Sequence, residues 1–82
     1  MPDLIKTQRE ILAMSLEARD QEVMGYQINI DNYRLAIADI EASGDTDLSD
    51  FAEQLRGLLK SELLEQKKAK VMRRVIAQQL EQ

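Results

Sequence analysis

The chain has 82 residues, of which 44% are hydrophobic and 32% charged, with a formal net charge of −4 at pH 7. This length forms one domain, and the apolar content is too high for a wholly disordered protein. Cysteine and histidine are absent, which excludes disulfides, thiolate or imidazole metal sites and histidine-activated nucleophiles. No apolar run approaches the roughly 20 residues of a membrane span, and Asp3, Lys6 and Arg9 interrupt any secretory signal. We expect a cytoplasmic protein.

A first helix is predicted over residues 3–43. Asp3 is a candidate N-cap, while residues 7–10 (TQRE) form a capping-box pattern that would start the helix later. Apolar side chains then recur every seven residues in two interleaved series, which is the pattern of a coiled-coil seam. The predicted seam of this helix consists of Leu12, Leu16, Val23, Ile30, Tyr33, Ile37 and Ile40.

A turn is predicted over residues 44–47, because Gly44 suits the left-handed conformation that ends a helix and turn-forming residues follow it. The region around this turn is acidic, with no lysine or arginine between residues 35 and 55. These carboxylates either keep a helix start solvated and favour its dipole, or form a surface for a basic partner. The acidic residues are Asp39, Glu41, Asp45, Asp47, Asp50 and Glu53.

A second helix is predicted over residues 48–81, and a short turn makes it antiparallel to the first. Its apolar seam is predicted to contain Phe51, Leu55, Leu58, Met72, Ile76 and Leu80. In this hairpin Ile40 would face Phe51, and Leu12 would face Leu80. The fold class is therefore all-α: an antiparallel two-helix coiled-coil hairpin.

The middle of the predicted seam is polar. There Tyr26 and Ile30 face carboxylates and an amide of the second helix, and buried carboxylates need partners or water. We interpret these residues as a polar layer that fixes the helix register; the alternatives are a notch for a ligand or partner and a frayed, exposed segment. The layer comprises Arg19, Tyr26, Glu62, Glu65 and Gln66.

Each helix carries apolar residues beyond its seam, which is more than a hairpin alone can bury. The expected result is a homodimer that forms an antiparallel four-helix bundle, with docking onto a different protein as the alternative. The residues assigned to this oligomer or partner face are Met14, Met24, Ile28, Leu35, Leu59, Leu63, Leu64, Val71 and Val75.

A basic stretch near the end of the chain could form a phosphate-binding stripe. However, the hairpin places it opposite Glu17, Asp20 and Glu22, so cross-helix ion pairs such as Glu22 with Lys70 would neutralise part of it. No aromatic side chain interrupts the stretch to stack on bases. Nucleic acid is therefore not the partner that we expect. The stretch comprises Lys67, Lys68, Lys70, Arg73 and Arg74.

Catalytic and metal chemistry are not expected. Residues 45–49 resemble the start of a calcium loop, but Asp50 stands where the loop needs glycine and Arg56 where it needs a bidentate glutamate. The chain has no histidine for a carboxylate-bridged di-metal site and no phosphate-cradling glycine loop. We expect no enzyme activity and no cofactor.

The stretches QEVMGYQINIDNYRLAIADIE and LLKSELLEQKKAKVMRRVIAQQLE make the chain similar to the small helical proteins encoded by tailed phages. This resemblance includes no functional motif and implies a modulator or inhibitor of a host protein, or a minor assembly factor, in the bacterial cytoplasm. The predicted function is a protein–protein interaction module with an unidentified protein partner. The alternatives are a structural or assembly coiled coil and a nucleic-acid binder that uses residues 67–74.

Overall fold

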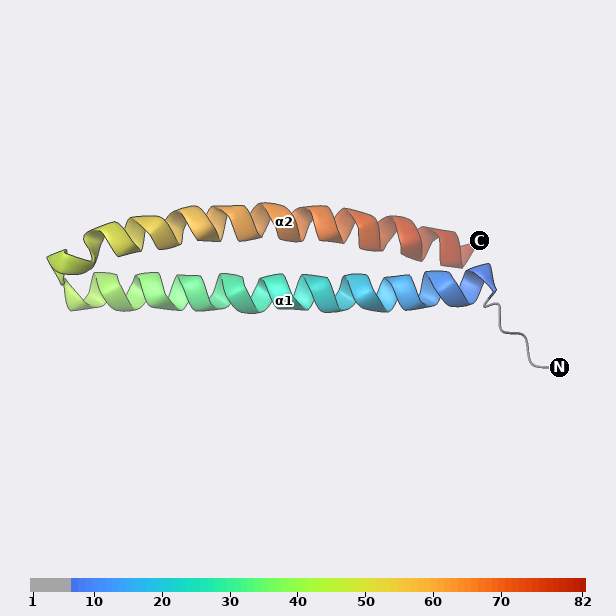
Figure 1. Cartoon of the computed structure of the whole chain (residues 1–82), viewed down its shortest axis with the longest axis horizontal. Helices are drawn as coiled ribbons and strands as arrows, with labels where there is room; N and C mark the ends of the chain where they lie inside the picture. Colours follow the sequence, from blue (N-terminus) through green and yellow to red (C-terminus); the bar gives the residue numbers. More distant parts are fainter. Residues whose placement is uncertain (1–6) are drawn as a thin grey trace.

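The computed structural model describes residues 7–82 as two long helices that pack side by side in opposite directions (Figure 1). α1 spans Gln8–Ser43 and α2 spans Ser49–Glu81, with a short 3-10 helix, η1 (Thr46–Leu48), between them. The predicted all-α helical hairpin is confirmed. The proposed N-cap Asp3 and the helix start at residue 3 lie outside the described residues.

The two ends of α1 are closed by local hydrogen bonds. At its start, the Thr7 hydroxyl oxygen accepts from the backbone N–H of Glu10 at 3.2 Å, which satisfies a donor that has no partner within the helix. At its end, Gly44 adopts a left-handed conformation with φ of 65° and donates to the carbonyl of Ile40 at 3.2 Å. This conformation strains any residue that carries a Cβ atom, so glycine fits the position.

The connection to α2 is a tight, hydrogen-bonded turn. The Asp45 carboxylate accepts from the N–H of Asp47 at 3.0 Å and caps η1. The Ser49 hydroxyl donates to the carbonyl of Thr46 at 2.9 Å where η1 passes into α2. Asp45 therefore caps η1, whereas Leu48, the N-cap residue of α2, makes no side-chain cap hydrogen bond.

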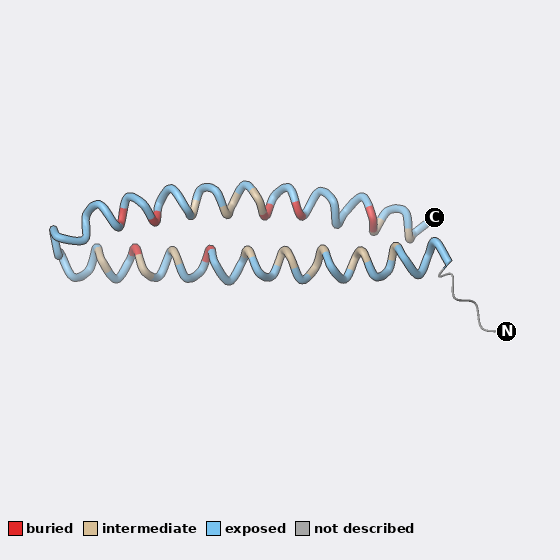
Figure 2. Tube along the Cα trace, viewed as in Figure 1, coloured by how far each residue is buried: buried red, intermediate tan, exposed pale blue. Residues whose placement is uncertain are grey.

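The buried residues lie on the sides of the two helices that face each other (Figure 2). In α1, Ile30 and Ile37 are buried, and Ile30 retains 1% of its accessible surface. All positions of the seven-residue pattern along α1 are buried or half-buried: Leu12, Leu16, Arg19, Val23, Tyr26, Ile30, Tyr33, Ile37 and Ile40.

The seam of α2 contains Leu55, Ile76 and Leu80, as predicted, but its other members differ. Phe51, Leu58 and Met72 were assigned to it but are 48%, 43% and 50% exposed. Each directly precedes a position that faces α1, and one residue rotates a side chain by about 100° around a helix. The observed seam positions, buried or half-buried, are Ala52, Leu55, Leu59, Glu62, Gln66, Ala69, Ile76 and Leu80.

Polar bonds between the helices fix the register. The Gln66 amide donates to the carbonyl of Val23 at 3.3 Å and to the Gln27 side-chain oxygen at 2.9 Å. Position 66 is therefore level with the α1 turn that contains Tyr26. Counting 11 residues toward the turn on each helix brings Leu55 level with Ile37, and counting 10 residues toward the open end brings Ile76 level with Leu16. At the turn, Ala52 rather than Phe51 is level with Ile40.

The centre of the seam is polar, and its cross-helix bonds are made by Gln66. Gln66 is buried and donates to Gln27, which in turn donates to Asp31 at 2.9 Å. Within residues 7–82 no hydrogen bond joins Tyr26 to a carboxylate of α2, and one buried carboxylate oxygen of Glu62, Oε2, has no partner. The predicted polar layer is therefore organised by Gln66 and Gln27 rather than by Tyr26.

The remaining members of the polar layer bond within their own helices. The Arg19 guanidinium donates to Glu22 at 2.8 Å, and the Lys68 ammonium donates to Glu65 at 3.0 Å.

At the far end of the seam, Arg9 of α1 donates to the carbonyls of Leu80 at 2.5 Å and Gln82 at 3.4 Å. A cation at this end of α2 also stabilises the helix dipole.

Gly44→Ala is predicted to lower the free energy of unfolding by about 1–2 kcal/mol, because alanine in the left-handed region is strained. Gly57→Ala is the matched control, since a Cβ atom there meets nothing within 4 Å and the residue lies inside α2. This control is expected to raise stability by roughly 0.5–1 kcal/mol. Thermal unfolding at one protein concentration measures both, and equal changes would contradict the role of Gly44.

Glu62→Leu is predicted to raise the free energy of unfolding by about 1–3 kcal/mol, because it removes an unbonded, buried carboxylate oxygen from the seam. Glu17→Leu, at an exposed position of α1, serves as the control and should change stability by less than about 0.5 kcal/mol. Urea unfolding of both variants makes the comparison. A destabilised Glu62→Leu protein would show that the carboxylate is satisfied in solution.

Candidate functional site

The hairpin has two broad faces, one on each side of the seam. The cross-helix polar bonds engage Asp20, Gln27 and Glu41 of α1, which are spaced by multiples of seven and therefore share one side. We call this side the charged face. It comprises Ala13, Glu17, Asp20, Met24, Gln27, Asp31, Arg34, Ala38, Glu41, Glu53, Arg56, Lys60, Leu63, Lys67, Lys70, Arg74, Ala77 and Glu81.

The opposite side carries far fewer charges, and we call it the apolar face. Four of its eighteen positions are charged, against twelve of eighteen on the charged face. The apolar face comprises Ile11, Ser15, Ala18, Glu22, Gly25, Asn29, Asn32, Ala36, Asp39, Phe51, Gln54, Leu58, Ser61, Glu65, Lys68, Met72, Val75 and Gln79. The side chains that the sequence assigned to the seam, Phe51, Leu58 and Met72, are exposed on this face.

The predicted oligomer or partner face is not a single surface. Met14, Ile28 and Leu35 lie on the outer edge of α1, which is the side turned away from α2, and Leu64 and Val71 lie on the corresponding outer edge of α2. Met24 and Leu63 belong to the charged face, and Val75 belongs to the apolar face. The seam member is Leu59, which is half-buried, so its assignment to an outward face is corrected.

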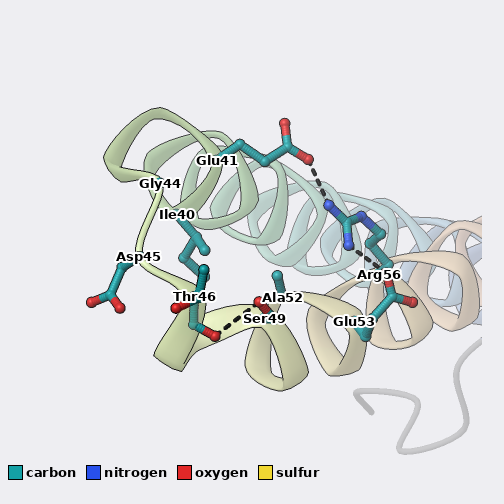
Figure 3. A pocket seen from close by; sticks show the side chains of 9 residues that line it. All are labelled: Ile40, Glu41, Gly44, Asp45, Thr46, Ser49, Ala52, Glu53 and Arg56. Carbon is teal, nitrogen blue, oxygen red and sulfur yellow. Dashed lines mark hydrogen bonds and ion pairs between the residues drawn. The ribbon is translucent and has the colours of Figure 1, made fainter.

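The turn forms a shallow pocket of about 350 Å³ lined by residues from both helices, with Arg56 at one side (Figure 3). Arg56 donates to Glu41 at 2.6 Å and to Glu53 at 2.5 Å, and these bonds, led by the one from Glu41, raise the pKa of Arg56 above its ordinary value. Arg56 thus neutralises part of the predicted acidic surface. It follows directly after the stretch without lysine or arginine, residues 35–55, on which that prediction was based. Its other members, Asp39, Asp45, Asp47 and Asp50, are exposed.

The basic stretch is divided between ion pairs and solvent. Arg73 pairs with Asp20 across the hairpin, and Lys68 pairs with Glu65 on its own helix. The ion pair expected between Glu22 and Lys70 is not formed, because Glu22 pairs with Arg19. Lys67, Lys70 and Arg74 lie on the charged face without an ion pair to any residue of the described chain.

A wider groove on the charged face, of about 820 Å³, is lined by Arg73, Arg74 and Lys70 and also by Asp20 and Glu81. The two carboxylates place negative charge beside the cations, so the groove is not a purely basic channel.

Across residues 7–82, no cluster of three or more acidic, histidine or cysteine side chains is placed to hold a metal ion. Neither described helix has an apolar stretch long enough to cross a lipid bilayer.

Comparison of the chain with protein-family models, with curated proteins and with solved structures finds no match.

Proposed function

We propose that the chain is a non-enzymatic protein–protein interaction module that first pairs with a second copy of itself to form a four-helix bundle. The observation that supports this proposal is the row of large apolar side chains that the hairpin leaves exposed beside its seam. Phe51, Leu58 and Met72 are each at least 43% exposed. Complete burial of a fully exposed side chain of this kind contributes roughly 1.5–3 kcal/mol, and covering the exposed part of each of these gains a corresponding share, which favours association over exposure to water.

The accessible surface of the chain supports the same proposal. It measures 6452 Å², whereas a compact monomer of 9.4 kDa is expected to expose about 5000 Å². The excess is larger than the roughly 800 Å² that each partner buries in a standard interface. Pairing through an interface of this size would therefore remove roughly half of the excess.

The resemblance to small helical phage proteins suggests a second partner, a host protein that the bundle modulates or inhibits. In this proposal the exposed carboxylates at the turn, Asp45, Asp47 and Asp50, contact a basic surface of that protein. The alternative is a purely structural or assembly role for the bundle, in which the acidic turn only keeps the molecule solvated. Charge reversal at the three aspartates distinguishes the two when light scattering shows that the variant is still a dimer, because loss of partner binding then reports on the contact and not on the assembly.

Nucleic-acid binding is a second candidate, because three cations of the basic stretch lie with Lys60 along one side of α2 and form no ion pair with other described residues. Against it stand the net charge of −4 and the carboxylates that line the neighbouring groove. Protein binding therefore remains the principal proposal.

Light scattering is predicted to give a mass of about 19 kDa, twice that of one chain, at protein concentrations of tens of micromolar. The apolar surface beside the seam would then be covered by the second copy. Circular dichroism on the same sample verifies that the protein is helical. A helical monomer of 9.4 kDa at these concentrations would contradict the proposed self-association.

Titration with duplex and single-stranded DNA is predicted to show no saturable binding at tens of micromolar protein in about 0.1 M salt. The reason is that carboxylates adjoin the cations of α2 and repel phosphate. The control is a Lys67→Glu, Lys70→Glu double variant, which should behave like the unmodified chain. Binding that weakens steeply with salt and disappears in this variant would favour the nucleic-acid alternative.

A further inference from the structure

We infer that the apolar face is the surface through which two copies pair, with the turn of each hairpin beside the open end of the other, where α1 begins and α2 ends. This inference rests on the proposed self-association and specifies which face and which orientation it uses. The face, the level of the two-fold axis and the orientation are each supported by a different observation.

The choice of face follows from charge and side-chain size. Pairing through the apolar face removes four charged positions per chain from water, whereas pairing through the charged face would remove twelve, and burial of unpaired charge is costly. In a bundle, a helix carries apolar residues on its seam and on one flank of it. α2 has this pattern, because Phe51, Leu58 and Met72 flank its seam on the apolar side.

The same side of α1 carries small residues that allow a second chain to approach closely. Ala18, Gly25 and Ala36 occupy it, and a Cβ atom built at Gly25 meets nothing within 4 Å. The apolar face is thus shallow over α1 and raised over α2, where the large side chains lie. A helix that meets small side chains packs more closely than one that meets leucine or phenylalanine.

The spacing along α2 indicates where a two-fold axis would cross it. Leu58 and Met72 each lie seven residues from Glu65, so an axis at Glu65 brings Leu58 of each chain to Met72 of the other. Glu65 is paired with Lys68 at 3.0 Å, so the two carboxylates near the axis arrive with their own counter-ions. Gln66 bonds to Val23 and Gln27, which places Gly25 at the same level on α1.

Electrostatics determines the orientation. If both turns lay at the same end of the dimer, the acidic surfaces of the two chains would lie side by side, and each carries six carboxylates against the single nearby cation Arg56. In the reversed orientation the two turns are separated by about 50 Å, the length of a helix of this size. That distance is several Debye lengths at physiological salt, and each turn then approaches the cation-rich half of the other chain.

Sedimentation equilibrium on the full chain tests the face. Leu58→Glu and Met72→Glu place a carboxylate in the proposed interface, and each is expected to raise the dimer dissociation constant at least about tenfold. Leu64→Glu is the matched control, because Leu64 is a leucine of the same helix, is 53% exposed and lies on the outer edge. It should change the constant less than about twofold. Circular dichroism verifies that each variant is helical.

The possible outcomes separate this inference from the proposal on which it rests. Weakening by both interface variants but not by Leu64→Glu supports the apolar face. If Leu64→Glu weakens the dimer while Leu58→Glu and Met72→Glu do not, the face is wrong although self-association stands. If the unmodified chain is a helical monomer at tens of micromolar, both the inference and the proposed self-association are overturned.

A spin label tests the orientation independently. The chain has no cysteine, so Thr46→Cys introduces a single attachment site at the exposed turn. Electron–electron distance measurement is expected to give about 50 Å between the two labels of a dimer. A distance within about 20 Å, as for neighbouring helix ends, would overturn the reversed orientation.

Discussion

Two helices without a third layer touch along one strip each, and every buried side chain of this hairpin lies in that strip. The strip is narrow, so few residues are fully buried, and Ile30 alone falls below 2% exposure among the described side chains. The seam is therefore long and thin, in keeping with the 66 Å length of the molecule. Much of the large apolar content of the chain consequently lies outside it.

The polar residues at the middle of the strip limit its stability and define its register. Gln66 reaches across the seam to Val23 and Gln27, and a slip by one turn would bury its amide without these partners, at a cost of roughly 1–3 kcal/mol. Glu62, one turn earlier, has a buried oxygen without a partner and so gives no comparable gain. A single satisfied amide thus specifies the alignment that the apolar residues on either side would allow to shift.

The sequence predicted the two helices, the turn at Gly44 and the seam of α1, because a seven-residue period in one helix identifies one stripe. For α2 it predicted Leu55, Ile76 and Leu80 correctly but wrongly added Phe51, Leu58 and Met72. The reason is that Leu55 has apolar residues one turn away on both sides, Phe51 and Leu58 on one and Ala52 and Leu59 on the other, so it belongs to two possible stripes. The bonds of Arg9, Gln27 and Arg56 were also missed. Long side chains reach across several positions, so their partners depend on rotamers and helix separation rather than on periodicity.

The presence of two possible apolar stripes on α2 has a consequence for how the helix packs. Its apolar stripe is wider than one neighbouring helix can cover, and α1 occupies the side that contains Ala52 and Leu59. The other side, with Phe51 and Leu58, has the width and spacing of a second seam and remains exposed in the hairpin. A helix with two seams that share their central residues is suited to contact two other helices, which is the situation of every helix in a four-helix bundle. The two stripes therefore favour a bundle over an isolated hairpin as the form in which the apolar surface of α2 is satisfied.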